Sequence, residues 1–197
     1  MNRAAIGFRV HSGWAAMVAV ALEDNLPAVL ERSKLQLVKT FSYTFRQPYH
    51  TAEKMQLDEA AGFVRSVENE SRELALAGIR SVQDKLQKVD YKVSGCSLLL
   101  ASGRALPDLE KILASHALIH TADGELFRDA IRHSCERAKV PVTAIKEREL
   151  LAAAAKRLNK RPQFLNRHVA ALGKTLGPPW TTDEKLSALA AWLVLAN

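Results

Sequence analysis

Three strand-like segments follow one another near the start of the chain, and this meander constrains the fold more than any other feature. The first, 6–11, alternates apolar and polar residues and ends at a turn, Ser12-Gly13. The second, 14–22, is almost wholly apolar, which is typical of a strand covered on both faces. The third, 27–38, carries charges among its leucines, as edge strands often do. The pattern predicts an antiparallel meander with the third strand outermost.

Helical and strand patterns alternate after the meander. A polar, aromatic connection over 40–50 leads into one or two helices, and a buried strand follows. We expect the later elements in this order: helices over about 52–88, a strand over 92–101, a helix from Pro107, a helix from near Thr121 to Ala138, a strand over 140–145, and helices over 147–159, 163–172 and 185–195. This order predicts an α/β fold with a mixed five-stranded sheet and helices on both faces. We expect one domain over 1–197, with a helical C-terminal extension from about 160.

The charge is unevenly distributed. The formal net charge is +7, from 28 Lys and Arg against 21 Asp and Glu. No acidic residue occurs in 151–182, which makes this stretch a candidate surface for nucleic acid or another phosphate-bearing partner. A solvated basic face is the alternative. The six cations of the stretch, hereafter the basic surface, are Lys156, Arg157, Lys160, Arg161, Arg167 and Lys174.

Cysteine usage and hydropathy indicate a cytoplasmic protein. Cys96 and Cys135 lie on apolar segments and are too few for a disulfide framework, so we expect two reduced, buried thiols. The chain starts without a signal-peptide pattern, and no apolar run approaches the roughly 18 to 20 residues that a membrane-spanning helix needs. Membrane partners are not expected.

The element order is similar to that of the ribonuclease H-like superfold, and most of all to its RuvC-type resolvase branch. Gly13-Trp14-Ala15 resembles the start of that family's second strand, and Ser187-Ala188-Leu189-Ala190 resembles the Asp-Ala-Leu-Ala of its last helix. The progression of helix, Val140-Pro141-Val142 strand and helix also fits. The resemblance covers most of the chain.

The resemblance implies carboxylates that gather divalent metal ions around a phosphodiester. The first strand should carry one of them, yet it offers Arg9 or His11. The segment 92–103 has no acid, and Ser187 stands at the position of the aspartate in the last helix. The acids Asp183 and Glu184 lie one turn earlier. The sequence therefore predicts a catalytically degenerate domain without the usual nuclease site.

A polar cluster over 116–125 has three interpretations. His116 and His120 would share one face of a continuous helix, with Asp123 or Glu125 as a third metal ligand. A helix starting at Thr121 would instead use these carboxylates in its first turn, and it could hold an anion beside His120. We favour the cap, and so we predict no metal site.

Other candidates follow from topology, because the carboxyl ends of strands line the functional crevice of open α/β sheets. This places Arg9, His11 and Glu147 near any site, together with Lys146 and the loop residues Ser102, Gly103 and Arg104. The candidate catalytic residues are therefore Arg9, His11, His120, Asp123, Glu125 and Glu147.

Three hypotheses for function follow. The favoured one is a binding or scaffolding domain without a cofactor, which engages nucleic acid through the basic surface. The second is a divalent-metal-dependent nuclease or phosphotransferase with a relocated site, built from Asp123, Glu125, Glu147, Asp183 or Glu184. The third is a protein-interaction module or homo-oligomer that uses the helix over 52–88 or the aromatic loop over 41–49.

Overall fold

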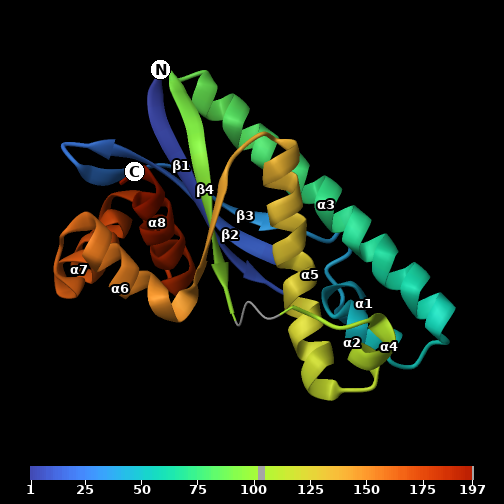
Figure 1. The fold of residues 1–197 in the computed structure, drawn as a ribbon. Helices are drawn as coiled ribbons and strands as arrows, with labels where there is room; N and C mark the ends of the chain where they lie inside the picture. The colour runs from blue at the N-terminus through green and yellow to red at the C-terminus, as the bar shows by residue number, and fades with distance from the viewer. Residues whose placement is uncertain (102–104, 197) are drawn as a thin grey trace.

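The computed structural model describes residues 1–101 and 105–196, and it contains a mixed five-stranded sheet (Figure 1). The strands lie in the order β3-β2-β1-β4-β5, with β1, β2 and β3 antiparallel and β4 and β5 parallel to β1. The predicted meander and the edge position of the third strand are confirmed. The bounds are β1 (Asn2–His11), β2 (Trp14–Glu23), β3 (Leu26–Gln36), β4 (Tyr91–Leu100) and β5 (Val142–Lys146).

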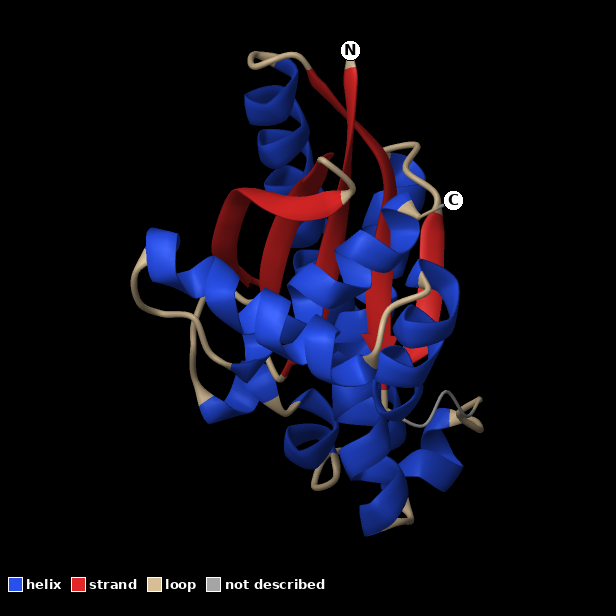
Figure 2. Ribbon diagram, turned by 90° about the vertical axis from the view of Figure 1, so that its left-hand side faces the viewer, coloured by secondary structure: helices blue, strands red, loops and turns tan. Residues whose placement is uncertain are grey.

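Helices cover both faces of the sheet, as predicted. The long α3 and α5 lie on one face, while α6, α7 and α8 form a layer on the other (Figure 1). Figure 2, turned so that this second layer faces the viewer, shows its helices lying over the strands. The bounds are α1 (Tyr43–Arg46), α2 (Pro48–Ala52), α3 (Leu57–Gln87), α4 (Leu109–Leu113), α5 (His116–Arg137), α6 (Glu147–Leu158), α7 (Pro162–Leu176) and α8 (Thr182–Leu195).

The alternation of side chains along β1 divides the core into two parts. Ile6 and Phe8 point into the cluster that includes α3 and α5, whereas Ala5 packs with α8. Gly7 also lies on the α8 face, because Ser187 and Ala191 of α8 are its nearest neighbours. Arg9 and His11 continue this face by the same alternation, which brings both to the α8 side of the sheet.

Contact between α8 and β1 is unusually close at Gly7. A Cβ atom added there would lie 1.9 Å from the carbonyl oxygen of Ser187. The neighbouring positions are also small, since Ala5, Ala188 and Ala191 are fully buried in the same interface. The division of 1–197 into one domain with a C-terminal extension stays a prediction, but α8 itself packs directly on β1, β2 and β4.

The structure corrects two expectations. α5 begins at His116 with Ser115 as its N-cap, so the expected start and cap at Thr121 are wrong. The Thr121 hydroxyl instead donates to the Ala117 carbonyl inside the helix. The connection over 40–50 also contains the short helices α1 and α2, the latter with Pro48 in its first turn, where a missing N–H costs little.

Other expectations about the elements and the thiols are confirmed. Of the one or two helices left open over about 52–88, the structure has one long helix from Leu57 to Gln87, α3. Cys96 and Cys135 are free and fully buried. A hydrogen bond with Cys135 and burial both raise the pKa of the Cys96 thiol, which makes it a poor nucleophile. Within 1–101 and 105–196, no helix is both long and apolar enough to span a bilayer.

The close approach at Gly7 yields the first prediction. Gly7→Ala should lower the free energy of unfolding by about 1–3 kcal/mol or more, because the new methyl group pushes α8 off β1. Gly62→Ala, at an exposed site on α3 with no neighbour within 4 Å, should instead stabilise by about 0.5–1 kcal/mol. Urea denaturation measures both. Equal stability of the Gly7 variant and the wild type would contradict the close packing.

Candidate functional site

Arg9 lies between two carboxylates where β1 nears its end. Its Nε and Nη2 donate to the two carboxylate oxygens of Glu147, each at 2.9 Å. Its Nη1 donates to Asp183. Glu147 opens α6 directly after β5, and Asp183 stands in the first turn of α8. Three segments that are remote in sequence therefore meet at one guanidinium.

His11 adds a second basic group to this network. Its Nε2 lies 2.8 Å from Asp183 Oδ1 and 3.3 Å from Arg9 Nη1. The His11 ring stacks on Trp14, with ring centroids 4.4 Å apart and planes 12° apart. Two basic side chains thus contact two carboxylates in one network.

The ion pairs shift pKa values in opposite directions. The hydrogen bond to Glu147 raises the pKa of Arg9, and the Asp183 contact adds to the rise against the effect of burial. Burial of the Asp183 carboxyl raises its pKa, but the hydrogen bonds and charges of Arg9 and His11 outweigh burial and hold the pKa below its ordinary value. Both groups are therefore held in their charged forms.

A cleft of about 650 Å³ opens beside this network. Its polar lining comes from the end of β1 and from helices of both layers, and the apolar end of β4 forms part of its wall. Arg128 of α5 is held there by Glu125, at 3.1 Å. The cleft therefore presents a largely basic set of side chains. Its lining includes Arg9, His11, Arg128, Glu147, Arg148 and Leu186.

Not all of the expected site residues meet at Arg9. His11, Glu147 and Asp183 do, whereas Glu184 closes a capping box with Thr181 at the start of α8. Ser187 is buried, and its hydroxyl donates to the Ala16 carbonyl at 3.2 Å. The loop candidates Ser102, Gly103 and Arg104 lie outside the described residues.

Asp123 belongs to a different cluster, on the α5 side. Its carboxylate accepts from the Tyr49 N–H at 2.7 Å and lies 2.5 Å from His50 Nδ1. Burial raises the pKa of the Asp123 carboxyl, although these hydrogen bonds oppose the rise. His120 contacts His50 in the same cluster. The sequence did not point to His50, since nothing local in it signals a partner 73 residues away.

A row of stacked aromatic and cationic side chains runs on from His11, and the sequence did not predict it either. The Lys34 ammonium lies 4.4 Å from the Trp14 ring centroid and 5.2 Å from that of Phe41. The Arg46 guanidinium lies 4.4 Å from the Phe41 ring centroid. In this row of Trp14, Lys34, Phe41 and Arg46, the contact of Trp14 with Lys34 depends on the pairing of β2 with β3, which the sequence does not specify residue by residue. Phe41 and Arg46 join the row from the connection after β3 and from α1.

The six side chains of the basic surface are all exposed on α6, α7 and their connection. Among the residues that the structure describes, none of the six forms an ion pair. Lys160 lies 5.4 Å from the ring centroid of Phe164, which is 39% exposed. These charges are therefore available to an anionic partner.

Comparisons with known proteins bear on the fold. No family model matches the chain, and no curated protein matches it by sequence. Among solved structures it is similar to RuvC from T. thermophilus in complex with a Holliday junction substrate, with a TM-score of 0.55 and 10% identity over 96% of this chain and 91% of that one. A second Thermus thermophilus RuvC structure matches over the same shares, with a TM-score of 0.53 and 10% identity. The fold is ribonuclease H-like and resembles that of RuvC.

The comparison confirms the predicted fold. The family resemblance implied a metal-binding carboxylate on the first strand, and β1 supplies a guanidinium instead. The donor set here does not fit a two-metal site, because Glu147 and Asp183 already bind Arg9 and no acid follows on β4 up to Ala101.

The Arg9 network yields the second prediction. At pH 7, Arg9→Gln should lower the free energy of unfolding by about 1–3 kcal/mol, because the charge-assisted hydrogen bonds to both carboxylates are removed. A carboxyl whose pKa is lowered by folding stabilises the protein above its unfolded pKa of about 3.9, and this stabilisation is lost as the pH falls through the lower folded value. The difference between wild type and variant should therefore shrink below about pH 4.

Urea denaturation at pH 7 and pH 3 measures this difference. The matched control is Arg148→Gln. Because the Arg148 side chain is 78% exposed, this replacement should change the free energy of unfolding by less than about 0.5 kcal/mol. A difference between Arg9→Gln and wild type that stays constant down to pH 3 would contradict the assigned role of Asp183.

Proposed function

We propose that this domain binds nucleic acid without cleaving it. The observation that carries the proposal is the guanidinium of Arg9, which occupies the space between Glu147 and Asp183. A ribonuclease H-like nuclease needs free carboxylates to gather metal ions at the phosphodiester. Here both carboxylates are already paired with a permanent cation.

The chemistry of arginine makes this pairing hard to displace. The guanidinium keeps its charge at any physiological pH, and its fork matches a carboxylate in bidentate fashion. A divalent cation entering between Glu147 and Asp183 would have to break three hydrogen bonds and would meet like charge. His11 contributes a further basic group beside Asp183.

Binding is supported by the charges that remain free. The basic surface has no acidic neighbour in sequence and no internal ion pair among the described residues, so its cations can contact phosphates. Exposed Phe164 beside Lys160 resembles the pairing of stacking and charge that nucleic-acid-binding surfaces use. The similar fold of RuvC, solved with a Holliday junction substrate, makes DNA the first ligand to test.

The alternative of a relocated metal site on the named acids has less support. Besides Glu147 and Asp183, the expected acids were Asp123, Glu125 and Glu184. Asp123 binds the Tyr49 amide, Glu125 binds Arg128, and Glu184 binds Thr181. These carboxylates are thus used as separate structural anchors rather than as one ligand set.

The third prediction concerns affinity. The wild-type protein should bind a labelled four-way DNA junction with an affinity that falls steeply with salt, as phosphate contacts require. Replacing Lys156, Arg157, Lys160 and Arg161 together by Gln should weaken binding and reduce the slope of log K against log salt by about 0.9 for each phosphate no longer neutralised. The control replaces four exposed cations elsewhere, Lys54, Arg80, Lys88 and Lys92. Absence of binding by the wild type at low salt would overturn the binding half of the proposal.

The fourth prediction concerns cleavage. With Mg²⁺ or Mn²⁺ present, the wild-type protein should leave the junction intact, because its carboxylates are occupied by Arg9. The measurement is denaturing electrophoresis of end-labelled DNA after prolonged incubation. Cleavage that requires the metal and disappears in Glu147→Gln and Asp183→Asn would overturn the proposal in favour of a nuclease.

A further inference from the structure

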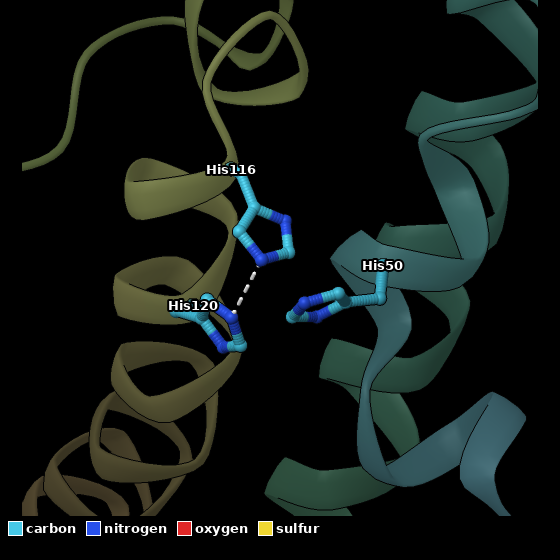
Figure 3. Close-up of side chains that lie close together, drawn as sticks. All are labelled: His50, His116 and His120. Carbon is cyan, nitrogen blue, oxygen red and sulfur yellow. Dashed lines mark hydrogen bonds between the residues drawn. The ribbon is translucent and has the colours of Figure 1, made fainter.

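Three histidines from two helices converge on the α5 side of the molecule, in the separate cluster around Asp123. His50 comes from α2, and His116 and His120 come from the first turns of α5. One ring nitrogen of each lies within 4.8 Å of the ring nitrogens of the other two. Figure 3 shows the three rings pointing toward one another across the gap between the two helices.

The Asp123 carboxylate fixes the orientation of the His50 ring. Its side chain is 9% exposed, and its Nδ1 lies 2.5 Å from Asp123 Oδ2. The other Asp123 oxygen is held by the Tyr49 N–H, so the carboxylate itself cannot turn freely. With Nδ1 donating to Asp123, Nε2 is the nitrogen left to act as an acceptor or ligand. A carboxylate behind a histidine in this way is the usual outer partner of a metal-binding imidazole.

His116 and His120 supply two further imidazoles beside that of His50. They stand four residues apart on one face of α5, and both are exposed. Their Nε2 atoms lie 3.0 Å apart. Two imidazole nitrogens on one tetrahedral Zn²⁺, with bonds of about 2.0–2.1 Å, would lie about 3.3 Å apart. Small side-chain rotations therefore bring this pair to ligand spacing.

The rings also meet edge-on rather than stacked. The planes of His50 and His116 are 89° apart, those of His116 and His120 79°, and those of His50 and His120 68°. Edge-on rings can direct their nitrogen lone pairs at a shared point, whereas parallel stacked rings cannot.

We propose that His50, His116 and His120 bind one divalent transition-metal ion, with Asp123 as the positioning residue of His50. Three imidazoles suit Zn²⁺ and its neighbours better than Mg²⁺ or Ca²⁺, which take oxygen ligands. The two exposed ligands leave a fourth position open to water. The ion would link α2 to the start of α5, and the site is separate from the network around Arg9.

Titration of the purified, metal-free protein with Zn²⁺ tests the site by calorimetry. We expect one ion per chain, and we expect His116→Ala and His120→Ala to weaken binding more than about 100-fold. Asp123→Asn should weaken it by about 10–100-fold, as outer-partner changes do. The control is His133→Ala on the same helix, which should bind as the wild type does. Co²⁺ in place of Zn²⁺ should give the absorption of a tetrahedral ion in the wild type and in this control, but not in the variants of His116 and His120.

His116 and His120 are exposed, so their variants keep the fold, and circular dichroism checks this. Wild-type binding no tighter than that of the variant lacking all three histidines would overturn the proposal. Binding that His133→Ala weakens as much as His120→Ala would also overturn it. The readout is metal stoichiometry and affinity, so the outcome is independent of whether the basic surface binds nucleic acid.

Discussion

The close packing of α8 against β1 at Gly7 is the contact on which the site depends. Because Gly7 has no side chain, the backbone of α8 at Ser187 can occupy the place where a Cβ would stand. Asp183 lies one helical turn before Ser187, and Arg9 lies two residues beyond Gly7 on the same face of β1. The contact therefore fixes the position of α8 along β1, and with it the position of Asp183 relative to Arg9. A bulkier residue at position 7 would move the carboxylate as well as weaken the core.

Around this contact, the cleft at the strand ends brings two carboxylates together at one cation. Carboxylates that converge at the end of a sheet repel one another unless a cation lies between them. In this protein the guanidinium of Arg9 performs this role between Glu147 and Asp183. A guanidinium stabilises such a cluster but, unlike a metal ion, offers no open coordination position and no Lewis acid.

The sequence predicted the features of this molecule that depend on local patterns. Strand alternation and the charges at Arg32 and Lys34 indicated the meander and its edge, and Arg9 stood out because the family resemblance implied an acid there. The partners of Arg9 lie 138 and 174 residues away, and no local pattern connects them. A local pattern also gave one wrong prediction. Thr121 with Asp123 and Glu125 looks like the start of a helix, but α5 already begins at His116. The Asp123 carboxylate instead binds Tyr49 and His50 of α2.

We propose that the Arg9 guanidinium, and not a divalent metal ion, occupies the space between Glu147 and Asp183. Line broadening of backbone amide NMR signals by Mn²⁺ distinguishes these two occupants, because broadening falls off steeply with distance from the bound ion. In the wild type, the signals of 146–149 and 182–186 should stay sharp, and in Arg9→Ala they should broaden as the two carboxylates become free. Broadening centred on Glu147 and Asp183 in the wild type would contradict the claim.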